Sequence, residues 1–319
     1  MNFSDTMQTE GAVIAAPAKR KKRKDIKTKI FIVCMLAYPV LQFLIFWVYV
    51  NFNSILMAFQ NESGAFDLTY MKEFFRILFS SNPNELARPS IINSIWFFLV
   101  GDFIGLPISL IYSYFMYKRV PGSKIFRVIF FLPSIISSVV LTSIYGYMLS
   151  ADPSTGVINN IIVNVFGGET IPFLESEKYV LGSILFYGLW FGMGMNILLI
   201  SGAIARIPED IFEYSRLEGV GFFREFIVIV IPLIFDTISS IFIMGAVGMF
   251  TQVGNILLLS PQTYMHKTST IGYYIYYLVQ ENMAYNQAAA AGLIFTCIGV
   301  PIIMGIRAIM NKICAGIEF

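Results

Sequence analysis

The sequence predicts an all-α, polytopic membrane protein with six transmembrane helices. Its 319 residues are 56% hydrophobic and 13% charged, and the mean hydropathy is +0.70. Soluble domains carry about 25% charged residues, so this composition indicates a chain that lies in a membrane. Apolar runs long enough to cross a bilayer recur along the chain, with polar segments between them.

The N-terminal residues 1–29 form a predicted cytoplasmic tail. Its last part, Lys19 to Lys29, holds eight Lys/Arg and one acid directly before the first apolar run. Such a segment can contact nucleic acid, but beside an apolar run it is typical of a cytoplasmic topology anchor, and we expect no nucleic-acid partner. The first run, 30–50, is too long for the core of a signal peptide, so we expect it to remain as a membrane helix.

Five further apolar runs predict the remaining spans, at 91–117, 128–149, 180–204, 226–252 and 287–310. The six runs define a transmembrane domain over 30–310, followed by a cytoplasmic tail at 311–319. Residues 51–90 and 150–179 are predicted outer loops, the first with a short amphipathic helix around Tyr70 to Phe79. Residues 253–286 are polar and aromatic, with no clear span before 287.

The distribution of basic residues supports this topology. All but five of the 22 Lys/Arg fall in segments predicted to be cytoplasmic. An excess of Lys/Arg in short loops marks the cytoplasmic side, which places both termini there in a multi-pass protein of the cell membrane. Five or seven spans would lose this bias. The five outer residues are Lys72, Arg76, Arg88, Lys178 and Lys267.

The cytoplasmic loop 205–225 predicts two helices joined by a sharp turn. Pro208, followed by two acids, is a favourable helix start. Gly219 and Gly221 tolerate positive φ and are expected to end that helix. A second helix begins near Phe222 and runs into the fifth span, which contains Pro232.

The segment from Glu213 to Pro232, EYSRLEGVGFFREFIVIVIP, resembles the EAA loop of binding-protein-dependent ABC importer permeases. Glu213 matches the family glutamate and Gly219 the family glycine, while Tyr214 and Ser215 replace two alanines. The resemblance implies the type I ABC importer permease fold and a loop that docks on a cytoplasmic ATPase. A simpler alternative is an ordinary amphipathic loop helix with Glu213 paired to Arg206 or Arg216. The coupling residues that the resemblance implies are Glu213, Tyr214, Ser215, Leu217, Gly219, Gly221 and Pro232.

Two other stretches resemble the carbohydrate branch of that family, the permeases for maltose and oligosaccharides. Residues 118–140 (KRVPGSKIFRVIFFLPSIISSVV) are followed by LSADPSTGVIN, and residues 257–277 read LLLSPQTYMHKTSTIGYYIYY. The resemblance implies a subunit that forms half of a sugar pathway. Its implied partners are a second, different permease, two ATPase subunits and an extracytoplasmic solute-binding protein. Another small solute, or an ion-coupled secondary carrier, remains an alternative, and residues 51–90 carry no family signal.

The resemblance also implies where substrate is bound, on the fourth and fifth spans. Asp102, a charged residue inside the second span, joins these candidates as a hydrogen-bond acceptor. The glycines among them have an alternative role in helix packing, and Asp102 with Asp236 can instead indicate a proton relay in a secondary carrier. The candidates are Trp190, Gly192, Met195, Asn196, Gly248, Met249, Gln252 and Asp102.

The sequence lacks the motifs that catalysis would require. There is no GxxxxGK[ST] motif, so ATP-Mg is expected on the partner ATPase and no cofactor on this chain. The one histidine, His266, falls in an outer segment, which leaves no HExxH motif and no Ser–His pair within the spans. Three separated cysteines predict neither a disulfide framework nor a metal site. We therefore expect a non-catalytic permease subunit.

Overall fold

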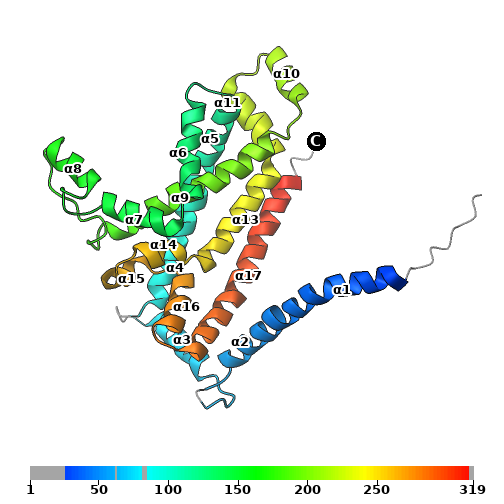
Figure 1. The fold of residues 1–319 in the computed structure, drawn as a ribbon, viewed down its shortest axis with the longest axis vertical. Helices are drawn as coiled ribbons and strands as arrows, with labels where there is room; N and C mark the ends of the chain where they lie inside the picture. The colour runs from blue at the N-terminus through cyan, green and yellow to red at the C-terminus, as the bar shows by residue number, and fades with distance from the viewer. Residues whose placement is uncertain (1–25, 62, 81–84, 316–319) are drawn as a thin grey trace, which may run out of the picture. The chain divides into compact units, whose positions relative to one another are not determined.

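The computed structural model describes residues 26–61, 63–80 and 85–315 (Figure 1). Most of the predicted N-terminal tail, residues 1–25, and residues 316–319 of the predicted C-terminal tail lie outside the described residues. Within these ranges the regular elements are helices, and the one β-type pairing is an isolated bridge between Gln60 and Phe66. The chain divides into two units, Met1–Asn53 and Ser54–Phe319, which are described separately.

The described part of the first unit contains α1 (Ile26–Gln42), the π-helical η1 (Phe43–Tyr49) and the beginning of α2 (Val50–Ala58). These segments follow one another as a helix whose part from Thr28 to Ala58 is long and apolar enough to cross a membrane. Helical structure thus continues beyond the predicted range 30–50. Its apolar side chains, such as those of Phe46 and Trp47, are exposed, as expected for a helix whose surroundings are lipid.

Three continuous helices of the second unit are also long and apolar enough to span a membrane. The first, Ala87–Tyr117, contains α4 (Ala87–Phe98), the π-helical η2 (Leu99–Gly105) and α5 (Leu106–Tyr117). The others are α9 (Val180–Ile204) and Tyr285–Ile313 within α17 (Tyr285–Ala315). The bounds of α9 are those of the predicted fourth span. An outer helix expected around Tyr70 to Phe79 is present as α3 (Thr69–Phe79).

Two further apolar segments are each bent. The first of them corrects the expectation of a single helix over 128–149. There α6 (Ser123–Ile135) and α7 (Ser138–Met148) meet at 118°, because the chain is extended at Ile136. Pro133 lies just before the break, and a proline deprives a helix of one backbone hydrogen bond. If each bent pair is counted as one span, the described residues contain six candidate spans.

The second bend, of 73°, lies in the predicted fifth span. It separates α11 (Phe222–Glu225), η3 (Phe226–Val230) and α12 (Ile231–Leu233) from α13 (Phe235–Thr251). Pro232 lies in α12, two residues before the non-helical Ile234. The shorter elements of the second unit are α8 (Val157–Asn164), α10 (Glu209–Leu217), α14 (Gly254–Leu259), η4 (Gln262–Tyr264), α15 (Met265–Thr268) and α16 (Ile271–Gln280).

The long helices pack side by side, with α9 against α5 and α6, and α13 along α17 (Figure 1). The short helix α10 lies at one end of this unit, and α3 and α16 lie at the opposite end (Figure 1). Near α10, apolar side chains of α5, α9, α10, η3 and α13 form a buried cluster that includes Leu110, Ile204 and Phe212. This cluster joins the predicted cytoplasmic loop to the helices behind it.

A buried polar side chain fixes the loop 150–179, which was predicted to be an outer loop. Asn159 is fully buried, and its side chain accepts a hydrogen bond from the Ile171 amide (2.8 Å) and donates to the carbonyls of Ser150 and Ile171 (2.8 and 2.9 Å). A Cβ at Gly156 would overlap the Ser150 carbonyl. The glycine and the asparagine of the PSTGVIN turn are therefore both required by this loop's geometry.

Candidate translocation cavity and coupling loop

A cavity of about 260 Å³ lies between α4–η2, α9 and α13, within the second unit. Most of its wall is apolar, with a few amide groups and one carboxylate, a composition typical of small-molecule sites. Among its wall residues only Asp102 carries a charge. The residues that line it are Phe97, Phe98, Val100, Gly101, Asp102, Leu185, Gly188, Leu189, Gly192, Met195, Asn196, Leu199, Ile241, Met244, Gly245, Gly248, Met249, Gln252 and Asn255.

Seven of the eight substrate candidates named from the sequence lie in this wall: Asp102, Gly192, Met195, Asn196, Gly248, Met249 and Gln252. Trp190 does not line the cavity. It packs in an apolar cluster with Tyr187, and their ring centroids are 6.5 Å apart. The helical period explains this, because Gly188, Gly192 and Met195 share one face of α9 and residue 190 points to another.

Asp102 occupies a special position in the wall. It is only 7% exposed and belongs to the π-helical η2, and such helical irregularities occur often at functional sites. A Cβ at Gly245 would overlap the Asp102 carboxylate, so α13 can approach this acid only because residue 245 is glycine. No hydrogen bond or ion pair to this carboxylate is found among the described residues.

Sequence reasoning missed the contribution of Phe97, Phe98 and Asn255 to the cavity. The two phenylalanines belong to an apolar span that gives no sign of which face is inward. Asn255 lies on α14, beyond the end of α13, and its amide would be 3.2 Å from a Cβ at Gly188. Its distance of three residues from Gln252 is the only sequence signal that could have indicated it.

The candidate coupling loop, residues 205–225, contains the two expected helices. Glu209 and Asp210 lie in the first turn of α10, where carboxylates interact favourably with the helix dipole. Gly219 ends α10 with φ +69°. Gly221 does not adopt a positive φ: this residue is extended (φ −71°, ψ 158°) and precedes α11, because the chain has already reversed at Gly219.

The two faces of α10 differ in exposure. Glu213 is exposed, and so are Tyr214 (69%) and Leu217 (83%). Phe212 and Ser215 are buried against the rest of the unit. Within the part of the chain that the structure describes, no ion pair joins Glu213 to Arg206 or Arg216. The helix therefore presents an uncompensated acid and two large apolar side chains on its outer face.

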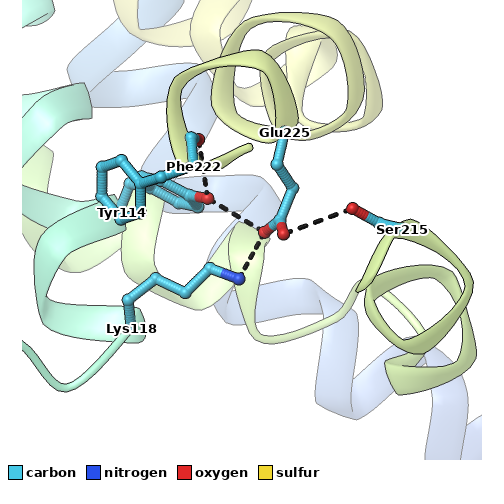
Figure 2. A network of polar contacts seen from close by, with 5 residues as sticks. All are labelled: Tyr114, Lys118, Ser215, Phe222 and Glu225. Carbon is cyan, nitrogen blue, oxygen red and sulfur yellow. Dashed lines mark hydrogen bonds and ion pairs between the residues drawn. The ribbon is translucent and has the colours of Figure 1, made fainter. Parts of the chain in front are cut away.

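A polar network that the sequence did not suggest joins the buried face of α10 to α5 and α11 (Figure 2). Glu225 is only 3% exposed, and its Oε1 is 2.5 Å from Lys118 Nζ. Tyr114 donates a hydrogen bond to the same oxygen (2.9 Å), and Ser215 donates to Oε2 (3.3 Å). Of these residues only Ser215 belongs to the predicted coupling set, and an acid two turns before Pro232 was the only sequence signal for the others.

Comparison with known proteins identifies the family to which this chain is similar. Residues 105–313 match the family described as "Binding-protein-dependent transport system inner membrane component". Protein LplB of Bacillus subtilis is 24% identical over 294 residues, covering 87% of this chain and 88% of LplB. The "Multiple sugar-binding transport system permease protein MsmF" of Streptococcus mutans is 24% identical over 282 residues, covering 85% of this chain and 92% of MsmF.

A solved structure gives the same answer for the architecture. A chain of the bacterial alginate ABC transporter, crystallised with an alginate pentasaccharide-bound periplasmic protein, superposes with a TM-score of 0.79 at 23% identity, covering 91% of this chain and 97% of that one. This likeness confirms the predicted all-α importer permease fold. Since the family match also covers most of the chain, this multi-pass membrane protein belongs to the family of inner membrane components of binding-protein-dependent transport systems.

Proposed function

We propose that this chain is one permease subunit of an ATP-driven importer for sugars or oligosaccharides, and that it forms half of the translocation pathway. The observation that carries the proposal is the convergence of Asp102, Asn196 and Gln252 on one cavity in a chain of this family. Sugar specificity is supported by MsmF, named a multiple sugar-binding transport permease, and by the alginate transporter.

The chemistry of the cavity suits a carbohydrate. Sugar hydroxyls both donate and accept hydrogen bonds, and the Asn196, Gln252 and Asn255 amides offer both kinds of partner. The Asp102 carboxylate accepts only, which favours hydroxyl donors over anionic groups. Phe97 and Phe98 supply flat apolar faces. Trp190 takes no part in this proposal.

A second permease subunit would complete the pathway. Met195 and Met244 of the cavity wall are 58% and 66% exposed, so the cavity opens at an apolar rim that another helical subunit can cover. We assign this place to a related but different permease, as in the carbohydrate branch. An extracytoplasmic solute-binding protein would deliver the sugar to the outer loops, with both termini of this chain in the cytoplasm.

The outer face of α10 provides the proposed ATPase contact. Tyr214 and Leu217 form an exposed apolar surface, and the neighbouring Glu213 supplies a charge that has no partner within the described residues. Two ATPase subunits would bind ATP-Mg and close, moving α10 and the attached helices as a rigid body. This chain would itself be non-catalytic and would hold no cofactor.

Uptake in reconstituted vesicles tests the proposal. We expect this chain to co-purify with an ATPase and a second permease, and to import labelled oligosaccharides only with ATP and the binding protein. Glu213→Ala should lower uptake strongly while the subunit still inserts in the membrane. Import that persists without the ATPase but requires a pH gradient would contradict the proposal and favour an ion-coupled carrier. Import of peptides but of no sugar would contradict the assigned substrate class.

A further inference from the structure

Glu225 is a buried acid that neither the cavity nor the outer face of α10 uses. It ends α11, at the point where the loop turns into the apolar segment of η3. A carboxylate in such surroundings loses much hydration energy and is tolerated only when it is paired and hydrogen-bonded. The structure provides such partners from other elements of the second unit (Figure 2).

The partners of Glu225 belong to two other parts of the unit, the end of α5 and the helix α10. Tyr114 and Lys118 belong to α5 and its C-terminal cap, and they contact Oε1 at 2.9 and 2.5 Å. Ser215 belongs to the inner face of α10 and donates to Oε2 at 3.3 Å. Tyr114 also donates to the Phe222 carbonyl (3.2 Å). One carboxylate therefore connects α5, α10 and α11.

Lys118 adds a second connection to α10. Its Nζ lies 5.1 Å from the ring centroid of Phe212 and 5.6 Å from that of Tyr114. Phe212 is fully buried on α10, and its ring centroid is 5.0 Å from that of Tyr117. A cation over an aromatic ring is held most strongly when both are shielded from water, as here.

The helix that receives these contacts leads to the cavity. Going backwards along the chain from Lys118, α5 continues directly into η2, which carries Asp102 in the cavity wall. We propose that Glu225 is a positioning residue that fastens α10 to the end of α5, so that a displacement of α10 is delivered to the span that carries Asp102. This inference rests on the proposed function, because it takes the ATPase as the source of that displacement.

Reconstituted complexes of this chain with its ATPase, second permease and binding protein provide the test. The main variant is Lys118→Met with Glu225→Leu, which removes both charges together and leaves neither one buried without its partner. Arg224→Gln is the matched control, because Arg224 is the exposed charged neighbour of Glu225. The quantity measured is sugar imported per ATP hydrolysed, normalised to assembled complex.

We expect the double variant to hydrolyse ATP while importing at least about tenfold less sugar per ATP, a typical size for coupling between distant sites. Arg224→Gln should keep the wild-type ratio. An unchanged ratio in the double variant would overturn the inference, whether or not the amount of assembled complex falls, because Glu225 would then only stabilise the fold. If the double variant fails to assemble, Tyr114→Phe decides: it removes one hydroxyl, and an unchanged ratio there would also overturn the inference.

A second readout separates this inference from the proposed function. A nitroxide at the exposed residue 217 reports the mobility of α10 in the Leu217→Cys variant of the permease without ATPase, provided that the native cysteines Cys34, Cys297 and Cys314 are first replaced by serine, since two of them are exposed and would also be labelled. The double variant should make this label more mobile, and Arg224→Gln should not. If the label were equally mobile in the double variant and in Arg224→Gln, the fastening role would be overturned even if sugar uptake is intact. A wild-type complex that imports no sugar would refute the proposed function, while increased mobility in the double variant would still support the fastening role.

Discussion

Asp102 and Glu225 are both buried acids of the same helical unit, yet their surroundings differ. Glu225 has a lysine, a tyrosine and a serine as partners, whereas Asp102 has no hydrogen-bond or ion-pair partner among the described residues. A buried carboxylate without a partner is costly, and one that also faces a cavity is available to a ligand. The comparison suggests that the protein uses one acid to hold helices together and the other to contact what passes between them.

Of the variants considered, Gly219→Pro should have the largest effect on transport. It should impair only the contact between the coupling loop and the ATPase. Gly219 has φ +69°, a conformation that proline cannot adopt because its ring fixes φ near −65°. We expect loss of ATPase co-purification and of uptake, with normal insertion of the subunit in the membrane. If this variant retained both uptake and the ATPase, the left-handed turn after α10 would have no role in coupling.

Lys118→Met alone should damage the fold rather than a single step of transport. It leaves the Glu225 carboxylate buried without its cation, and breaking a buried pair in this way costs about 3–5 kcal/mol. We expect a much lower melting temperature of the purified subunit in detergent. Adding Glu225→Leu should recover most of the loss. Equal stability of the single and the double variant would contradict the assignment of Glu225 as the acid that needs Lys118.

Gly245→Ala should distort the cavity around Asp102 and thereby lower the stability of the protein. The new Cβ would overlap the Asp102 carboxylate, and overpacking of this kind typically costs about 1–3 kcal/mol. Gly248→Ala is the matched control for stability, because a Cβ there meets no atom within 4 Å. Thermal unfolding of the two variants measures the difference. Equal melting temperatures would mean that Asp102 can move aside without cost.

The pair between Glu177 and Lys267 should give the smallest effect, since both residues are partly exposed. The hydrogen bond from Lys267 holds the pKa of the Glu177 carboxyl below its usual range. With a lowered folded-state pKa, any stabilisation is present above the ordinary pKa of a glutamate and is lost as the pH falls through the lowered value. Glu177→Gln should therefore leave the melting temperature at pH 7 nearly unchanged. A large decrease would show that this exposed ion pair contributes to stability as the Glu225 network does.

Much of the fold could be predicted from the sequence because long apolar runs and segregated basic residues are direct consequences of the bilayer. The break at Ile136 could not, since a proline inside a span can either kink a helix or end it. The family spacing predicted residues of α9 that line the cavity. It also predicted Trp190, which lies outside the cavity wall, because spacing alone does not fix which face of a helix points inward.

The Glu225 network lay beyond sequence reasoning for a different reason. Lys118 and Glu225 are far apart in the chain, and each alone resembles an ordinary charge at the edge of a membrane span. Only the packing of α5 against the loop reveals that they form a buried pair.

The most direct test of this account compares Asp102→Asn with the Lys118→Met/Glu225→Leu double variant in the same reconstituted transporter. Asp102→Asn should raise the KM for sugar about tenfold or more, since a hydrogen bond to a charged group contributes about 1.5–3 kcal/mol, and should leave the sugar imported per ATP unchanged at saturation. The double variant should lower the sugar imported per ATP and leave the KM unchanged. If both variants changed the same quantity, the two acids would not have separate roles, and the division between ligand contact and mechanical coupling would be wrong.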